Sequence, residues 1–100
     1  ISGGLNVYPK EVEDILDEFK GIQESAVFGV DHADLGEAVV AVIVLSEGGN
    51  IDLDNVINYS KEKLANYKVP KHIEVISNLP RNTMGKVQKK VLRSSYKSIF

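Results

Sequence analysis

The stretch Glu37-Ala38-Val39-Val40-Ala41-Val42-Ile43-Val44-Leu45-Ser46 contains the longest apolar run of the 100-residue chain. Its eight apolar residues, 38–45, are mostly β-branched, and β-branched side chains favour strands. The run is short for a helix and lacks the polar alternation of a half-exposed strand, so it predicts a central strand buried on both faces. It is also far shorter than the ~20 apolar residues of a membrane-spanning helix, and the sequence predicts no such span.

The patterns on either side of this strand alternate between helical and extended. Pro9 suits the first turn of a helix, and the apolar residues after it recur at helical spacing. The predicted elements are a helix over 9–20, a strand over 26–30, the central strand over 37–46, a helix over 52–67 with Asp52 as its N-cap, a strand over 73–75 and a basic helix over 87–96. This α-β-β-α-β-α order predicts one domain, residues 1–100, of the α+β class, in which helices pack on a small three-stranded sheet.

Charge is distributed unevenly along the chain. Residues 1–60 contain two lysines and twelve acidic residues, whereas residues 61–100 contain ten basic residues and two acidic ones. Either the basic part faces an anionic partner, such as a nucleic acid or a phosphorylated cofactor, or the two parts neutralise each other within the fold. The chain has no cysteine and no basic-then-apolar leader, so a cytoplasmic location is expected.

A polar loop over residues 78–89 closes on Gly85-Lys86 and is the first candidate functional segment. Lys86 carries a point charge on a flexible stem, which can reach a phosphate or a carboxylate outside its own domain. The alternative is that Lys86 is one of ten lysines and has no role beyond the surface. A phosphate-binding loop of the G-x-x-x-x-G-K-S/T type is excluded, because Pro80 replaces the first glycine and Val87 replaces the hydroxyl residue.

Other catalytic constellations find little support. His32 and His72 are far apart and neither belongs to a ligand-spaced pair, so no metal site is expected. No serine lies in a nucleophile elbow, so a catalytic triad lacks support. The aromatic residues are scattered, so single-stranded nucleic-acid binding is weakly supported. A glycine pair, Gly3-Gly4, lies near the start of the chain, where missing side chains let another group approach closely. Lys86 and this pair lack a general base and a pocket wall, which indicates a module that completes a site on another domain.

Four short motifs extend over nearly the whole chain. They are Ser2-Gly3-Gly4-Leu5-Asn6-Val7-Tyr8-Pro9-Lys10-Glu11-Val12-Glu13, Gly29-Val30 through Asp31 to Gly36-Glu37, Tyr67-Lys68-Val69-Pro70-Lys71, and Leu79-Pro80-Arg81 to Gly85-Lys86. In this order they resemble the C-terminal domain of AMP-forming acyl- and aryl-CoA synthetases, which are adenylate-forming enzymes. The run 81–89 looks most like that of malonyl-CoA synthetases, so the resemblance implies a ligase of fatty-acid or dicarboxylic-acid metabolism.

This resemblance implies two half-reactions, in which a carboxylic acid and ATP first form an acyl-adenylate and the CoA thiol then displaces AMP. Lys86 would be the catalytic lysine of the first step, where it would bridge the substrate carboxylate and the α-phosphate. After a rotation of the domain, Ser2, Gly3 and Gly4 would line the channel for the pantetheine arm of CoA.

The resemblance also implies partners outside these 100 residues. A larger N-terminal ATP- and acid-binding domain and a hinge would precede Ile1, and that domain would bind most of the ATP and its Mg²⁺. The 100 residues alone are therefore expected to be inactive. A lysine acyltransferase and deacylase acting on Lys86 are further implied partners, because acylation removes the charge. Two positions depart from the family pattern: many relatives have a basic residue in place of Ile1 and arginine in place of Lys89.

Two further interpretations stay open. The chain could be the lid of a peptide-synthetase adenylation domain, which passes its acyl group to a carrier-protein thiol. It could also be a freestanding module that binds a phosphorylated ligand or a nucleic acid through the basic residues of 61–100.

Overall fold

Three helices pack on a three-stranded sheet in the computed structural model, which describes all residues 1–100. In chain order the elements are α1 (Pro9–Asp17), β1 (Ile22–His32), β2 (Gly36–Leu45), α2 (Leu53–Lys63), a 3₁₀ turn η1 (Asn66–Lys68), β3 (His72–Val75) and α3 (Lys89–Tyr96). The predicted α-β-β-α-β-α order and α+β class are confirmed. None of the helices has the length and apolar character needed to cross a membrane.

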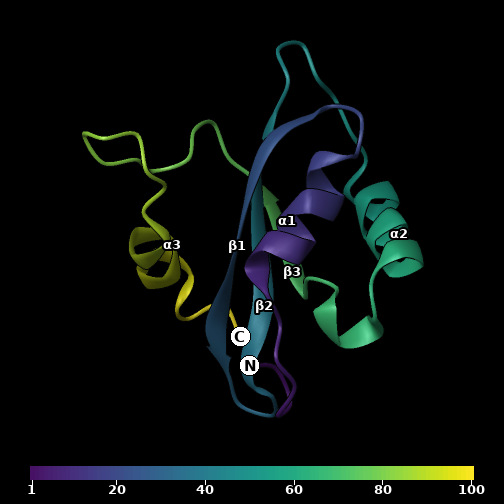
Figure 1. The fold of residues 1–100 in the computed structure, drawn as a ribbon, viewed down its shortest axis with the longest axis vertical. Helices are drawn as coiled ribbons and strands as arrows, with labels where there is room; N and C mark the ends of the chain where they lie inside the picture. Colours follow the sequence, from purple (N-terminus) through teal and green to yellow (C-terminus); the bar gives the residue numbers. More distant parts are fainter.

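The strand β2 lies in the middle of the sheet, as its composition predicts (Figure 1). It pairs antiparallel with β1 along nearly its whole length and parallel with the short β3. Residues 38–44 are all buried, because helices cover both faces of the sheet. The prediction of a central strand without a solvent-facing side is confirmed.

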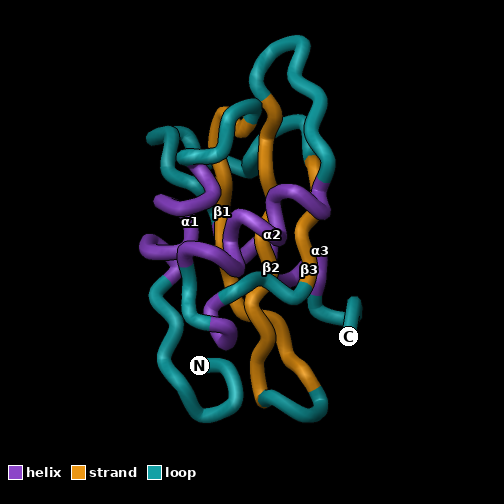
Figure 2. Tube along the Cα trace, turned by 90° about the vertical axis from the view of Figure 1, so that its right-hand side faces the viewer, coloured by secondary structure: helices purple, strands orange, loops and turns teal.

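Alternate side chains of β2 enter two separate cores. Figure 2 shows α1 and α2 lying across one face of the sheet, and α3 lies against the other face. From β2, the core under α1 and α2 contains Val39, Ala41 and Ile43, and the core under α3 contains Val40, Val42 and Val44. The sheet is thus the middle layer of three.

The strand β1 is longer than predicted, because the backbone ladder of β2 continues past the apolar residues and pairs with polar ones such as Glu24. A β-bulge between Ile22 and Glu24 shifts the register at its start. Because the bulge adds one residue to β1, the alternation of side chains between the two faces of the sheet is reversed on its two sides. Ile22 therefore enters the core under α1 and α2, whereas Ala26 and Phe28 enter the core under α3.

The end of α1 also differs from the prediction. The helix stops at Asp17, so Lys20 lies beyond its last turn. Glu18 and Phe19 donate their backbone N–H groups to carbonyls three residues back, which tightens the end of the helix. Gly21 then takes a φ of +103°, a conformation that glycine adopts readily.

The other two helices are shorter than predicted as well. Asp52 caps α2 as expected, because its carboxylate accepts the backbone N–H two residues on at 2.9 Å. The helix ends at Lys63 because Leu64 turns to an extended conformation and is buried. The helix α3 begins at Lys89, since Val87 pairs across the loop that precedes it.

The two-sided burial of β2 makes a prediction about stability. Replacing the fully buried Ile43 by alanine should destabilise the chain by about 2–5 kcal/mol, because the cavity forms in the middle layer and cannot collapse easily. Urea unfolding followed by circular dichroism measures this change. Met84→Ala removes a side chain that is 90% exposed and should change stability by less than about 0.5 kcal/mol. Equal effects of the two substitutions would contradict the proposed role of β2.

Candidate functional site

Residues 81–87 form a tight loop, called the Lys86 loop below, that presents Lys86 to solvent. Arg81 and Val87 pair as an isolated antiparallel bridge at its base. Above the bridge, the backbone N–H of Asn82 donates to the carbonyl of Lys86 at 3.0 Å. The backbone of the catalytic candidate is therefore part of a closed hydrogen-bonded ring.

The side chain of Asn82 closes the same loop from inside. Its Oδ1 accepts the backbone N–H groups of Met84 and Lys86, both at 2.9 Å. Gly85 supplies the positive φ of +83° that the turn needs before Lys86. Because these bonds lie within the loop, the backbone at Lys86 is held while its side chain stays free.

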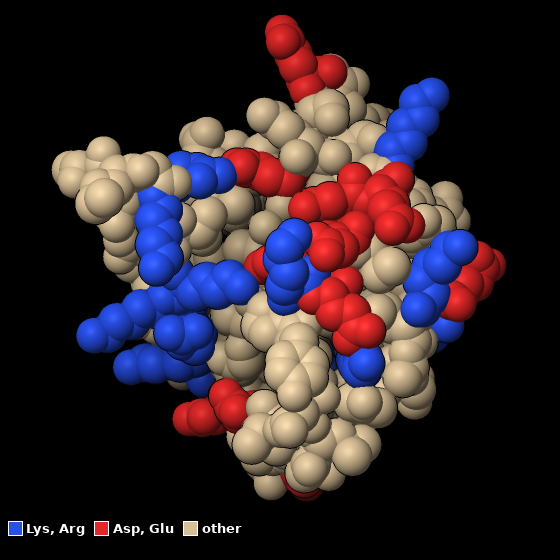
Figure 3. All heavy atoms as spheres, viewed as in Figure 1, with Lys and Arg blue, Asp and Glu red and all other residues tan.

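Lys86 is exposed and makes none of the six ion pairs of the chain. Beside it is a wide, shallow hollow lined by Lys89, Lys90 and Arg93 of the neighbouring helix. Figure 3 shows basic side chains gathered over α3, while acidic side chains gather over α1. The arrangement offers an unpaired ammonium to an anionic group that approaches from outside.

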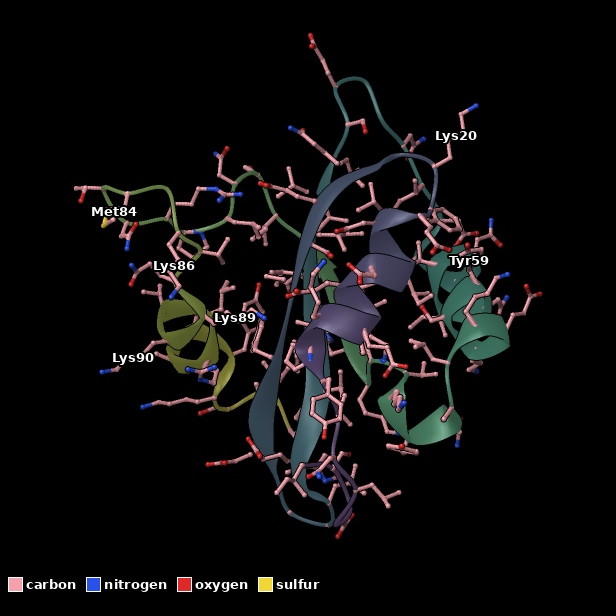
Figure 4. The ribbon with its side chains drawn as sticks, in the orientation of Figure 1. Lys20, Tyr59, Met84, Lys86, Lys89 and Lys90 are labelled. Carbon is pink, nitrogen blue, oxygen red and sulfur yellow. The ribbon has the colours of Figure 1, made fainter.

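Lys89 differs from its basic neighbours. Its Nζ lies 2.8 Å from Oε2 of Glu13 on α1, and its side chain is only 30% exposed. In Figure 4 it points back toward the sheet, whereas Lys90 points away from the molecule. The charge of Lys89 is thus used inside the domain.

The glycine loop at the start of the chain is a two-residue hairpin turn. Ser2 and Leu5 exchange backbone hydrogen bonds of 2.8 and 3.0 Å across it. Gly3 and Gly4 have φ values of +58° and +81°, and a turn of this kind needs positive φ at both central residues. An added Cβ at Gly4 would meet nothing within 4 Å, so this part of the loop faces open space.

The turn between β1 and β2 holds the glycine loop in place. The N–H of Gly3 donates to the carbonyl of Leu35 at 2.9 Å. His32 is half-buried, and its Nδ1 accepts the N–H groups of Asp34 and Leu35 at 3.1 and 3.2 Å. Its role in the fold is to shape this turn.

The predicted site residues form two groups that the fold keeps apart. Lys86 lies on the loop between β3 and α3, and the loop of Ser2, Gly3 and Gly4 lies beside the β1–β2 turn, at the other end of the sheet (Figure 1). The most enclosed cavity lies next to Ser2 and measures about 110 Å³. Small-molecule sites usually need about 300 Å³ or more, so the cavity beside Ser2 is too small for a nucleotide. The hollow beside Lys86 is larger but open to solvent, so neither group encloses a nucleotide by itself.

A hydrogen-bonded cluster fastens α3 to β3. The hydroxyl of Tyr96 donates to Glu74 at 2.6 Å, and the other carboxylate oxygen of Glu74 lies 3.2 Å from His72 Nε2. Burial and the hydrogen bond to Glu74 raise the pKa of Tyr96 to about 12. The hydrogen bonds from Tyr96 and His72 lower the pKa of Glu74. His72 thus takes part, through Glu74, in holding the helix that follows the Lys86 loop.

Asn82 is a site residue that the sequence analysis missed. Asparagine at the first position of a turn and glycine at the fourth are typical of a type I turn, and Asn82 and Gly85 have this spacing. Arg81 was also missed as a contact residue, and its partner Glu24 lies 57 positions away. No local pattern links residues at that separation.

Comparison with known proteins gives consistent results. The family model of the AMP-binding enzyme C-terminal domain matches residues 11–86. A methyl-dioxo-octahydroindenyl-propanoyl:CoA ligase of Rhodococcus jostii is 47% identical over 97 residues, which are 97% of this chain and 19% of the relative. The indoleacetate–CoA ligase of Aromatoleum aromaticum is 43% identical over 93 residues, 93% of this chain and 18% of the relative.

Solved structures give the same picture. Apo MatB from Rhodopseudomonas palustris superposes with a TM-score of 0.96 at 54% identity, over 99% of this chain and 20% of that chain. The chain spans about a fifth of the length of the relatives it matches.

The Asn82 side chain is expected to control the order of the Lys86 loop. Asn82→Ala removes the acceptor of two backbone N–H groups, so the amides of Met84 and Lys86 should exchange with solvent on the order of tenfold faster. Hydrogen exchange followed by nuclear magnetic resonance measures each amide. Asn82→Asp retains the acceptor oxygen and should keep the slow exchange. Unchanged exchange in the alanine variant would show that the side chain does not hold the loop.

The raised pKa of Tyr96 predicts a loss of stability at high pH. An ordinary tyrosine ionises near pH 10, so stability from the neutral Tyr96 is complete below pH 10 and is lost as pH rises toward about 12. Phenolate absorbance should show one tyrosine ionising near pH 12, and Tyr96→Phe should remove this step. The variant should also lose stability less steeply over the same interval. A step near pH 12 that persists in Tyr96→Phe would refute the assignment.

Proposed function

The chain belongs to the AMP-binding enzyme C-terminal domain family, and from this membership we propose that it is the mobile lid of an AMP-forming acyl-CoA ligase. Residues 1–100 would act with a larger N-terminal domain of the same ligase, joined to it by a hinge. The complete enzyme would convert a carboxylic acid and ATP to an acyl-adenylate and pyrophosphate. The CoA thiol would then attack the acyl carbon and release AMP.

The presentation of Lys86 is the observation that carries this proposal. Its backbone is held by the loop, and its ammonium has no partner within the chain. A positive charge presented from a held backbone position can oppose the negative charge that builds up between the carboxylate and the α-phosphate during adenylate formation. We therefore assign Lys86 to the first half-reaction.

The glycine loop would serve the second half-reaction. Gly3 and Gly4 present backbone without side chains, and Ser2 anchors the loop, so a narrow pantetheine arm could pass close to it. Because this loop and Lys86 lie at opposite ends of the domain, one rotation would exchange the group that faces the active site. The distance between the two groups supports a lid with two working positions.

The larger domain would bind most of each substrate. This chain contains no cluster of three His, Cys, Asp or Glu side chains that could hold a metal ion. The Mg²⁺ that accompanies ATP would be bound by the larger domain. The acid would be bound there too, and a dicarboxylic acid such as malonate is our proposed substrate, because residues 81–89 resemble those of malonyl-CoA synthetases.

Regulation and alternative acceptors concern the same residues. Acylation of Lys86 by a lysine acyltransferase would remove the charge that the first half-reaction needs, and a deacylase would restore it. A carrier-protein thiol in place of CoA would leave the role of Lys86 unchanged. A freestanding nucleic-acid module would instead use the whole basic surface over α3.

The proposal predicts a selective effect of Lys86→Ala in the full-length ligase. Adenylate formation, measured as pyrophosphate release, should fall by about 100- to 1,000-fold, because one preorganised charge is lost. Thioester formation from supplied acyl-adenylate and CoA should stay near its original rate. Lys90→Ala removes a neighbouring exposed lysine and is the matched control.

The other outcomes separate the alternatives. Normal adenylate formation by Lys86→Ala would refute the assignment of the lysine. Failure to use CoA together with transfer to a carrier protein would favour the peptide-synthetase interpretation. Salt-dependent binding of DNA or RNA by the chain, without any ligase activity of the full-length protein, would favour the freestanding module.

A further inference from the structure

Two ion pairs join the ends of the Lys86 loop to the opposite, acidic part of the chain. Arg81, at the start of the loop, pairs with Glu24 of β1. Lys89, just after the loop, pairs with Glu13 of α1. They connect segments that are distant in sequence, and the second pair joins α3 to α1, which covers the opposite face of the sheet.

The Arg81 guanidinium bridges the loop and the sheet. One nitrogen donates to the carbonyl of Gly85 at 2.7 Å, and another donates to Oε2 of Glu24 at 2.5 Å. Gly85 directly precedes Lys86, so the same side chain contacts the loop tip and the strand. A planar guanidinium suits this double contact better than an ammonium would.

The bulge in β1 places Glu24 where Arg81 can reach it. After the bulge, Glu24 lies two and four positions before Ala26 and Phe28, so its side chain is on the same face of the strand as theirs, the face toward α3. Ile22, before the bulge, faces α1 and α2 instead. One extra residue thus keeps an apolar anchor in one core while it aims a carboxylate at the Lys86 loop.

Glu13 is held by the backbone of β1 as well as by Lys89. Its Oε2 accepts the backbone N–H of Val27 at 2.9 Å and lies 2.8 Å from the Nζ of Lys89. The Glu13 side chain is only 16% exposed, so water screens this pair less than an ordinary surface pair. The start of α3 is therefore tied to α1 through a fixed carboxylate.

From this geometry we propose that the Arg81–Glu24 and Lys89–Glu13 pairs are positioning contacts for Lys86, an inference that rests on the function proposed above. Hydrogen bonds within the loop set its shape. Its orientation depends on contacts with the rest of the domain, where Leu79 and Val87 pack in the core under α3 and the two ion pairs reach β1 and α1. The two pairs fix both ends of the loop relative to the domain. They hold the point from which the Lys86 ammonium reaches the reacting groups, and they do not touch those groups themselves.

The test compares the two half-reactions of the full-length ligase. Glu24→Gln and Lys89→Gln should each slow adenylate formation on the order of tenfold, because a small displacement of a catalytic group lowers the rate strongly. Thioester formation from supplied acyl-adenylate should not change, since Lys86 has left the site by then. Lys89→Arg preserves the charge that pairs with Glu13 and should restore adenylate formation. Glu47→Gln neutralises an exposed acid that makes no ion pair and is the matched control.

The results divide clearly. Equal losses in both half-reactions would mean that the two ion pairs only stabilise the fold. Unchanged adenylate formation would mean that they do not position Lys86. Either result overturns the inference. Lys86→Ala is assayed beside these variants. If it blocks adenylate formation while Glu24→Gln and Lys89→Gln do not, only the positioning role is lost. If it has no effect, the proposed function itself fails.

Discussion

Burial of β2 on both faces is the constraint on which the rest of the structure depends. Its side chains alternate between two cores, so helices must cover both sides of the sheet. That requirement places α1 and α2 on one face and α3 on the other. The chain leaves the end of β3 and continues to the face that α3 covers, and the Lys86 loop lies in that connection. A functional residue reaches the surface here because of how the core is divided.

The two candidate loops are built in the same way. Each is a short turn with glycine at positive φ, closed by its own backbone hydrogen bonds. Each is then fastened to the sheet by a contact from a distant segment, Leu35 for the glycine loop and Glu24 for the Lys86 loop. Local bonds give the loops their shape, and distant contacts give them their direction. This division lets a small domain present two separate groups accurately without an enclosed pocket.

The sequence predicts the elements of this fold well because their signals are local. The apolar run of β2, Pro9 at the start of α1 and the Asp52 cap each depend on neighbouring residues. The boundaries of β1 and the pairing of Glu24 with Arg81 depend on partners that only the folded chain brings near. Lys86 and the glycine pair could be proposed from motifs, whereas the residues that hold them could not.

The bulge between Ile22 and Glu24 has a consequence for how this domain can change over evolutionary time. Gln23 is the extra residue of the bulge, and many side chains would be compatible with its position because it lies outside the regular ladder. Its removal would be far less tolerable, because loss of one residue would move Ile22 to the opposite face. The tie between the loop and the sheet therefore depends on the number of residues in this segment more than on the identity of Gln23. Descendants of this sequence should accept substitutions here and reject insertions or deletions.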